Sequence, residues 1–198
     1  MSGWMKKFTD KLRTDRKTSV ALLTVLMVAL AAAGVFQLSG GSDQRPEFNR
    51  NDIMFMNMMI IHHDQAVEMA ELSENRTNNS NILEISQNIS EAQQEENRVM
   101  AEWLRGAGFN RPTRGHRMAG MATAQEMEQL RQSRGREYDL LFSKLMIEHH
   151  RGGIQMARAE VQNGRSEKLI DLAQEMVEAQ TEEIQRMESW RDEWTGSS

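Results

Sequence analysis

The sequence contains no cysteine, only two prolines and only one tyrosine among its 198 residues. A chain without cysteine forms no disulfide, binds no metal through thiolates and has no thiol nucleophile. Alternating runs of Val, Ile and Thr, which are typical of strands, are missing after residue 40. These absences exclude disulfide scaffolds, zinc ribbons and thiol enzymes, and they favour an all-helical domain.

What the sequence does contain supports the same fold class. Glu, Gln, Ala, Leu, Met and Arg dominate, and all of them are good helix formers. Methionine is unusually frequent, with 16 residues. Charged residues make up 27% of the chain, so it is not wholly embedded in a membrane.

The N-terminal region has the pattern of an export signal. Basic residues precede an apolar run from Val20 to Phe36, and they are Lys6, Lys7, Lys11, Arg13, Arg16 and Lys17. A spanning helix needs about 20 apolar residues, whereas the core of a cleaved signal has about 7–15. The run has 17 residues, which is at the lower limit for a spanning helix and slightly long for a signal core, and Ala31–Ala33 offers a cleavage site. We expect residues 1–18 to be cytoplasmic and 19–38 to be a transmembrane anchor or signal peptide. The rest lies outside the cell membrane, and is secreted if the signal is cleaved.

Charge divides the chain in the same place. The net charge is −5, of which residues 1–18 contribute +4 and residues 19–38 nothing, so that residues 39–198 carry −9. Nucleic-acid binding depends on Lys and Arg that neutralise phosphates. An exported domain of this charge is therefore a poor candidate for nucleic acid and a better one for cations.

The exported part is an internal duplication. Residues 39–49 form a polar linker rich in Gly and Ser, followed by a domain over 50–194. Shifted by 87 positions, residues 52–103 align with 139–190 without a gap, and 16 of the 52 positions are identical. The identities include both His-His pairs and the later positions Gln93/Gln180, Glu96/Glu183 and Trp103/Trp190.

Each repeat predicts a helical hairpin, and two hairpins make an antiparallel four-helix bundle. In the first, a helix over about 51–74 is followed by a second helix that Asn81 and Glu84 cap. In the second, Gly164 ends one helix and Ser166 caps the next. Between the repeats, the loop over 106–123 leads into a short helix capped by Thr123 and Glu126.

Methionine and histidine recur on one helix face of each repeat. Residues three, four or seven apart share a face of a helix. The first copy has Met59, His62, His63 and Met69, and the second has Met146, His149, His150 and Met156. Adjacent histidines point about 100° apart, so the sequence leaves open which one of each pair faces inward.

Further candidates lie opposite these residues or in the central loop. Additional metal ligands are Met56, Met100, Met187, His116, Met118 and Met121. Glutamates that could support the histidines by hydrogen bonds are Glu91, Glu95, Glu96, Glu178, Glu182 and Glu183. With the hairpin turn centred near residue 77 or 78, His63 is expected level with about Ala92.

This combination of residue types is suited to copper. Thioether sulfur is a soft ligand that selects Cu(I), and imidazole binds copper in either oxidation state. Methionine is a usable soft ligand where cysteine would be oxidised. The simpler alternatives are that the methionines fill the core, that the loop is an ordinary connection and that Glu96 and Glu183 lie at the rim.

The same residues resemble a known family. "MIIHHDQAVEMA" and "LMIEHHRGGIQMA", with "MAGM" before the second, are similar to the bacterial "domain of unknown function 305" family over about residues 48–194. The resemblance implies a ferritin-like four-helix bundle that is often exported or membrane-anchored, and it implies copper binding. Asp64-Gln65 stands where the second copy has Arg151-Gly152, so the two half-sites are not expected to be equivalent.

Three functions follow from these observations. The first is a non-enzymatic, membrane-tethered Cu(I) buffer or chaperone, which could pass copper to an exported cuproenzyme or respiratory complex. The second is a dinuclear metal oxidase using the glutamates and histidines, although Met59, Ile60, Met146 and Ile147 stand where its Glu-x-x-His signature requires Glu. The third is an accessory structural subunit of a membrane complex.

Overall fold

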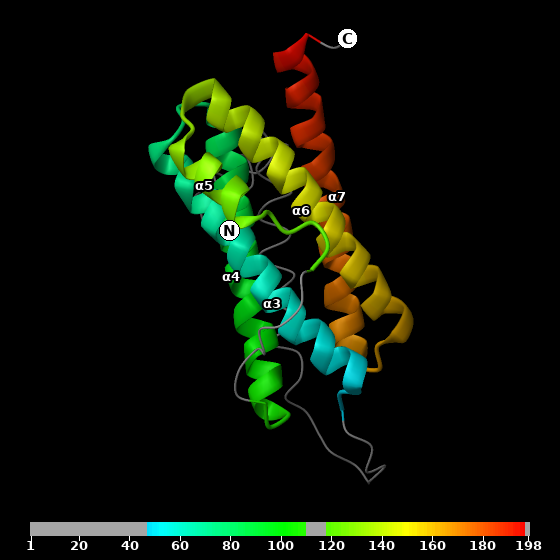
Figure 1. Ribbon diagram of the computed structural model, residues 1–198. Helices are drawn as coiled ribbons and strands as arrows, with labels where there is room; N and C mark the ends of the chain where they lie inside the picture. Colours follow the sequence, from blue (N-terminus) through cyan, green and yellow to red (C-terminus); the bar gives the residue numbers. More distant parts are fainter. Residues whose placement is uncertain (1–46, 110–117, 197–198) are drawn as a thin grey trace, which may run out of the picture. The chain divides into compact units, whose positions relative to one another are not determined.

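The computed structural model describes residues 47–109 and 118–196, and its regular elements in these ranges are all helical. The elements are α3 (Arg50–Glu71), the 3-10 helix η1 (Leu72–Asn75), α4 (Ser80–Gly106), α5 (Ala124–Gln132), α6 (Gly135–Asn163) and α7 (Glu167–Thr195) (Figure 1). No strand occurs in the described ranges. The all-helical prediction is therefore confirmed for this part of the chain, and the long helices form a bundle.

The first hairpin consists of α3 and α4. A capping box starts α3, because the Asn49 side chain accepts hydrogen bonds from the first turn and the Asp52 carboxylate accepts one from the Asn49 N–H. The α-helix ends at Glu71, earlier than predicted, because the chain tightens into η1. The connection then extends from η1 to Asn79, so the centre of the turn lies further along the sequence than predicted.

The predicted cap of α4 at Asn81 is wrong by two residues. The helix begins at Ser80, and the side chain of Asn79 caps it by accepting a hydrogen bond from the Asn81 N–H. An asparagine occupies both positions, so the sequence offers two caps. The conformation of the preceding turn selects the earlier one.

The second hairpin, α6 and α7, follows the sequence more closely. Gly164 ends α6 and Ser166 is the N-cap residue of α7, as predicted, although its side chain makes no capping hydrogen bond. The capping box of Thr123 and Glu126 at the start of α5 is also confirmed. Gly135 has a φ of 54°, a conformation that favours glycine, and the break there separates α5 from α6.

Each hairpin turn is held by the aspartate that begins the other repeat. Asp52 accepts hydrogen bonds from the backbone N–H groups of Arg165 and Ser166 in the α6–α7 turn. Asp139, its equivalent in the second repeat, accepts one from Asn79 in the α3–α4 turn. Each hairpin is therefore hydrogen-bonded to the turn of the other, and the two hairpins are related by a pseudo-twofold axis.

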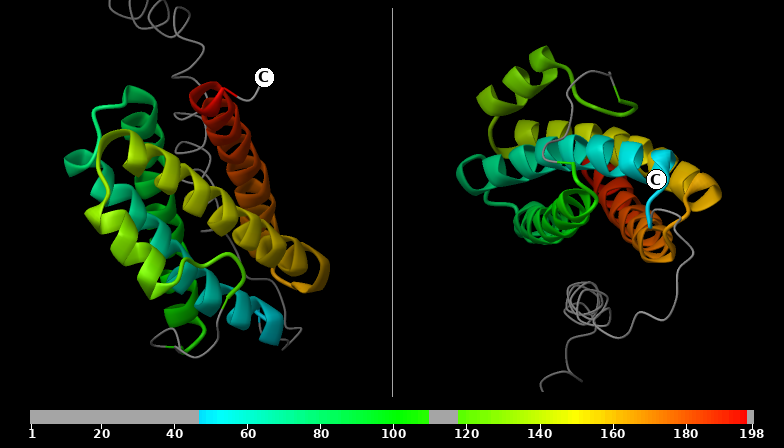
Figure 2. Two further views of the ribbon diagram at one scale, coloured as in Figure 1. Left: turned by 45° about the horizontal axis from the view of Figure 1, so that its top comes forward. Right: turned by 90° about the horizontal axis from the view of Figure 1, so that it is seen from below.

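The bundle has two layers, in which α3 packs against α6 and the α4 and α7 helices lie on one side of this pair (Figure 2). The core between them contains residues of both repeats, such as Ile85, Phe142 and Ile147, with at most 1% exposure. The α3–α6 contact places the two His-His pairs at the middle of the bundle.

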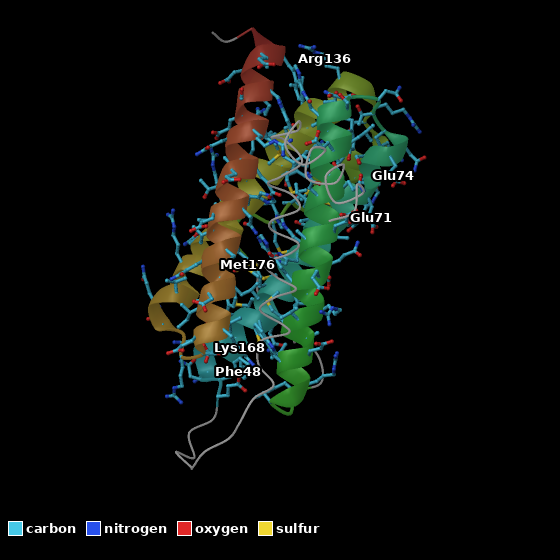
Figure 3. All side chains as sticks on the ribbon, turned by 180° about the vertical axis from the view of Figure 1, so that it is seen from behind. Phe48, Glu71, Glu74, Arg136, Lys168 and Met176 are labelled. Carbon is cyan, nitrogen blue, oxygen red and sulfur yellow. The ribbon has the colours of Figure 1, made fainter. Side chains whose placement is uncertain are left out.

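A lysine packs against two aromatic rings at one end of the bundle. The Lys168 ammonium lies 4.9 Å from the ring centroid of Phe48 and 4.7 Å from that of Trp103. Figure 3 shows that Phe48 and Lys168 lie next to each other at this end. Such cation–π contacts fix the residue before α3 against the end of α4 and the start of α7.

No helix within the described ranges is long and apolar enough to cross a membrane. The predicted anchor or signal at 19–38 lies outside these ranges, as do the basic segment 1–18 and the linker up to residue 46.

Candidate metal centre

The first histidine of each pair lies at the pseudo-twofold axis. The ring centroids of His62 and His149 are 3.7 Å apart, with an angle of 33° between the ring planes. Both side chains are 0% exposed. The two repeats thus bring their first histidines into contact at the middle of the bundle.

The second histidine of each pair turns toward the other helix of its own hairpin. His63 Nε2 lies 2.6 Å from Glu96 Oε2, and His150 Nε2 lies 2.7 Å from Glu183 Oε2. A carboxylate only accepts, so Nε2 donates the proton in both contacts. In the neutral ring, this leaves the lone pair on Nδ1 for another partner. Carboxylates that orient imidazoles in this way are common behind metal ligands.

Most of the inward nitrogens have no hydrogen-bond partner. These atoms are Nδ1 of His62, His63 and His150 and both ring nitrogens of His149. A buried polar atom without a partner costs about 1–3 kcal/mol. A neutral imidazole keeps one N–H, so these four rings offer four lone pairs, one on each ring, as potential metal ligands.

Burial keeps the central pair of imidazoles neutral. Burial, followed by the neighbouring His63, lowers the pKa of His62 to about 3. Burial and the adjacent His62 lower the pKa of His149 well below its ordinary value. At neutral pH no proton competes with a metal for these two rings.

The loop before α5 covers His62. The His62 Nε2–H donates to the carbonyl oxygen of Ala119 at 3.2 Å, which leaves Nδ1 with the lone pair. A Cβ atom on Gly152 would overlap the Ala119 carbonyl group, and one on Gly120 would overlap backbone of α6. The glycine of α6 therefore permits the close approach of this loop to the helix backbone.

Gln65, which occupies the position in α3 equivalent to Gly152 in α6, binds the same loop through hydrogen bonds. The Gln65 amide donates to the Ala122 carbonyl at 3.0 Å and accepts from the Ala122 N–H at 2.7 Å. One loop thus contacts both repeats, which explains why the repeats differ here. The two half-sites are not equivalent, because the Ala119 carbonyl is hydrogen-bonded to His62 and not to His149.

Four predicted methionines lie near the level of the histidines. The His63–Glu96 contact fixes the hairpin register, so that Met59 and Met100, four residues before and after, lie level with each other. By the same register Met146 lies level with Met187 in the second hairpin. All four are 0% exposed, and they lie about 6 Å along the axis from the second histidine of each pair. Met56 is also 0% exposed, another turn along α3.

The remaining predicted sulfur ligands are placed differently. Met69 lies about 10 Å along α3 from His62, in the apolar core with Phe142. Met156, its equivalent, lines a groove at the far end of α6. Met118 is buried and Met121 half-buried on either side of the Ala119–Gly120 backbone. His116 lies outside the described residues.

The structure brings two of the six predicted glutamates to the histidines, Glu96 and Glu183. The others point outward: Glu91, Glu178 and Glu182 are exposed, and Glu95 is half-buried and bonded to Arg98. Because the turn is shifted, His63 lies level with Glu96 rather than with Ala92 as predicted.

Sequence reasoning did not single out two buried glutamines beside this centre. Gln93 and Gln180 occupy equivalent positions one turn before Glu96 and Glu183, and each is 3% exposed. Their Oε1 atoms have no hydrogen-bond partner, and Gln180 fills the space that the missing side chain of Gly153 leaves. The sequence feature that could have identified them is that glutamine occupies this position in both repeats.

The site combines few charged ligands with soft sulfur. Among the described residues, no three His, Asp or Glu side chains are grouped so that they could hold one ion by themselves. The rings of His62 and His149 lie face to face, so shared coordination requires ring rotation. Imidazoles completed by buried thioethers suit a low-coordinate soft ion such as Cu(I).

If Glu96 and Glu183 orient the histidines, replacing both with glutamine is expected to raise the Kd for Cu(I) by about 10- to 100-fold, as for other carboxylates behind metal ligands. Glutamine keeps the size of the side chain but not its charge. A competition titration measures the change, and the matched control replaces the exposed Glu91 and Glu178 with glutamine. Equal Kd values in the two double variants would show that the carboxylates do not support the site.

Fold and site together define a helical-bundle protein with a buried His/Met centre. The family model "Domain of unknown function (DUF305)" matches residues 52–191, and the chain belongs to this family. No curated protein matches the chain.

Solved structures of related proteins match most of the domain. The DUF305 protein of Streptomyces coelicolor is 32% identical with a TM-score of 0.66, over 69% of this chain and 89% of that one. A DUF305 fragment from Deinococcus radiodurans is 25% identical with a TM-score of 0.68, over 74% and 98%. CopM in its Cu(I)-bound form is 26% identical with a TM-score of 0.63, over 72% and 96%. CopM has also been solved with Cu(II) and with Ag.

Proposed function

We propose that this protein is a non-enzymatic Cu(I)-binding protein that buffers copper or passes it on. The observation that carries the proposal is that His62, His63, His149 and His150 are fully buried and each has a ring nitrogen without a hydrogen-bond partner. Buried methionines lie one turn away, at Met59 and Met146. The copper- and silver-bound structures of the related CopM support the same choice of metal.

A binding role fits this donor set better than catalysis of oxidation. A dinuclear oxidase holds its metals mainly through carboxylates that project inward. The carboxylates nearest the histidines are Glu96 and Glu183, and both are used in hydrogen bonds to His63 and His150. We therefore prefer a buffer or chaperone to an enzyme, on a scaffold of two antiparallel hairpins that we describe as ferritin-like.

We also propose that the domain works outside the cell membrane, tethered by residues 19–38 or secreted after cleavage. The basic and apolar pattern of the N-terminus supports this location. An exported cuproenzyme or respiratory complex is the recipient that we propose. An accessory role in such a complex, without copper, is the alternative.

A competition titration with a Cu(I) chelator tests the proposal. The chain is expected to bind at least one Cu(I) tightly. The variant in which His62, His63, His149 and His150 are all alanine is expected to lose this binding. Circular dichroism of the variant controls for folding. Equal binding by both proteins, with helicity preserved, would reject the histidines as the site.

A further inference from the structure

A groove of about 290 Å³ lies between the first half of α3 and the last turns of α6, away from the histidine centre. Three of its lining residues are methionines: Met54, Met58 and Met156. The Asn51 side chain donates to the Asn163 carbonyl at 3.1 Å and closes the end of the groove. The two antiparallel helices therefore present three thioethers to one space.

These methionines are poorly explained as core packing. Met54 is 55% exposed, and Met58 and Met156 are half-buried. An exposed thioether gains little from the hydrophobic effect, and a charged or polar residue is usual at such a helix position. Three soft sulfur atoms around one open groove are, by contrast, a ligand set for Cu(I) or Ag(I).

The floor of the groove favours a cation. Glu160 lines it, is 2% exposed, and has an Oε1 atom without a hydrogen-bond partner. The Glu160 carboxyl shares a hydrogen bond with Asp52, so two acidic groups lie next to the groove.

The groove is also connected to the histidines along α3. Met54, Met58 and His62 are four residues apart in turn, so they form one row on the helix with steps of about 6 Å. Exposure falls along the row, from 55% at Met54 to 0% at His62. A soft ion captured at the surface has ligands at each step toward the interior.

We propose that Met54, Met58 and Met156 form a second, surface-accessible site for one Cu(I) or Ag(I) ion, which captures the metal for the buried histidines. The capture role rests on the proposed function of the histidine centre. The metal site itself does not, because none of its ligands is a histidine.

The test counts Ag(I) ions on the full chain by native mass spectrometry. The variant with alanine at His62, His63, His149 and His150 is expected to keep one ion. Adding Met54→Leu, Met58→Leu and Met156→Leu is expected to remove it, since leucine keeps the volume without the sulfur. The control adds Met127→Leu and Met176→Leu, buried methionines outside the groove, and is expected to keep the ion.

A second measurement does not depend on the folding of the histidine variant. In the wild-type chain with methyl-labelled methionine, Ag(I) is expected to shift the NMR signals of Met54, Met58 and Met156. Unmoved signals, or an ion that survives the three leucine substitutions, would overturn the groove site. If the wild-type chain and the histidine variant bind equal numbers of ions, the histidine proposal fails while the groove site stands.

Discussion

The wild-type chain is expected to lose stability as the pH rises from about 4.5 to 8, and the Glu160→Gln variant is expected not to show this loss. Glu160 is 2% exposed and is hydrogen-bonded to Asp52. Burial and this aspartate raise its pKa from 4.5 to about 8. Between these values the unfolded chain releases the proton of Glu160, while the folded chain keeps it.

The sign of the effect follows from this difference. Stability from the protonated Glu160 is complete below pH 4.5 and is lost as the pH approaches 8, at about 1.4 kcal/mol per pH unit and by up to about 5 kcal/mol. Glutamine can donate the same hydrogen bond to Asp52 but does not titrate.

Urea unfolding of both proteins at several pH values measures the difference in the free energy of unfolding. The free energy of unfolding of Glu160→Gln is expected to rise relative to that of the wild-type chain up to about pH 8, after which the difference levels off. Glu167→Gln, an exposed change on α7, is the control. A difference that stays constant across this pH range would refute the shared proton.

Alanine at Gly152 is expected to destabilise the protein by about 1–3 kcal/mol, in the range of other overpacking changes. The added Cβ would overlap the Ala119 carbonyl, and backbone cannot rotate aside as a side chain can. The loop must move, which draws Ala119 away from His62 and strains the hydrogen bonds of Ala122 with Gln65.

Gly153 provides the matched control. An alanine there meets the Gln180 side chain instead of backbone, and replacing glycine within a helix gains about 1 kcal/mol. Gly153→Ala is therefore expected to be close to neutral. Hydrogen exchange of the Ala122 amide distinguishes the two variants, with faster exchange expected only in Gly152→Ala. Unchanged stability and exchange in Gly152→Ala would mean that the loop does not pack against α6 as described.

The duplication and its histidines could be predicted because they are periodic features of the sequence. The shift of 87 residues places His62 and His149 at equivalent positions, and two equivalent helices that pack about a twofold axis bring such positions together. The sequence could not decide which histidine of each pair lies at the axis. That depends on the rotation of α3 and α6, which the packing of both hairpins sets.

The partners of the histidines were harder to predict, because they depend on the hairpin register. The 3-10 helix η1 and the extended turn to Asn79 add residues between α3 and α4. This moves Glu96, rather than Ala92, to the level of His63. The hydrogen bond between His62 and the loop could not be predicted from the sequence either. Its acceptor is the backbone carbonyl of Ala119, and every residue type has such a carbonyl.

The central claim is that buried histidines and methionines bind Cu(I) together. X-ray absorption at the copper edge of the Cu(I)-loaded chain tests it most directly, with the His62→Ala/His149→Ala variant beside it. The account predicts a low-coordinate Cu(I) with both nitrogen and sulfur neighbours, and a reduced nitrogen contribution in the variant, which keeps His63 and His150. A spectrum with sulfur neighbours alone, identical in the two proteins, would contradict it.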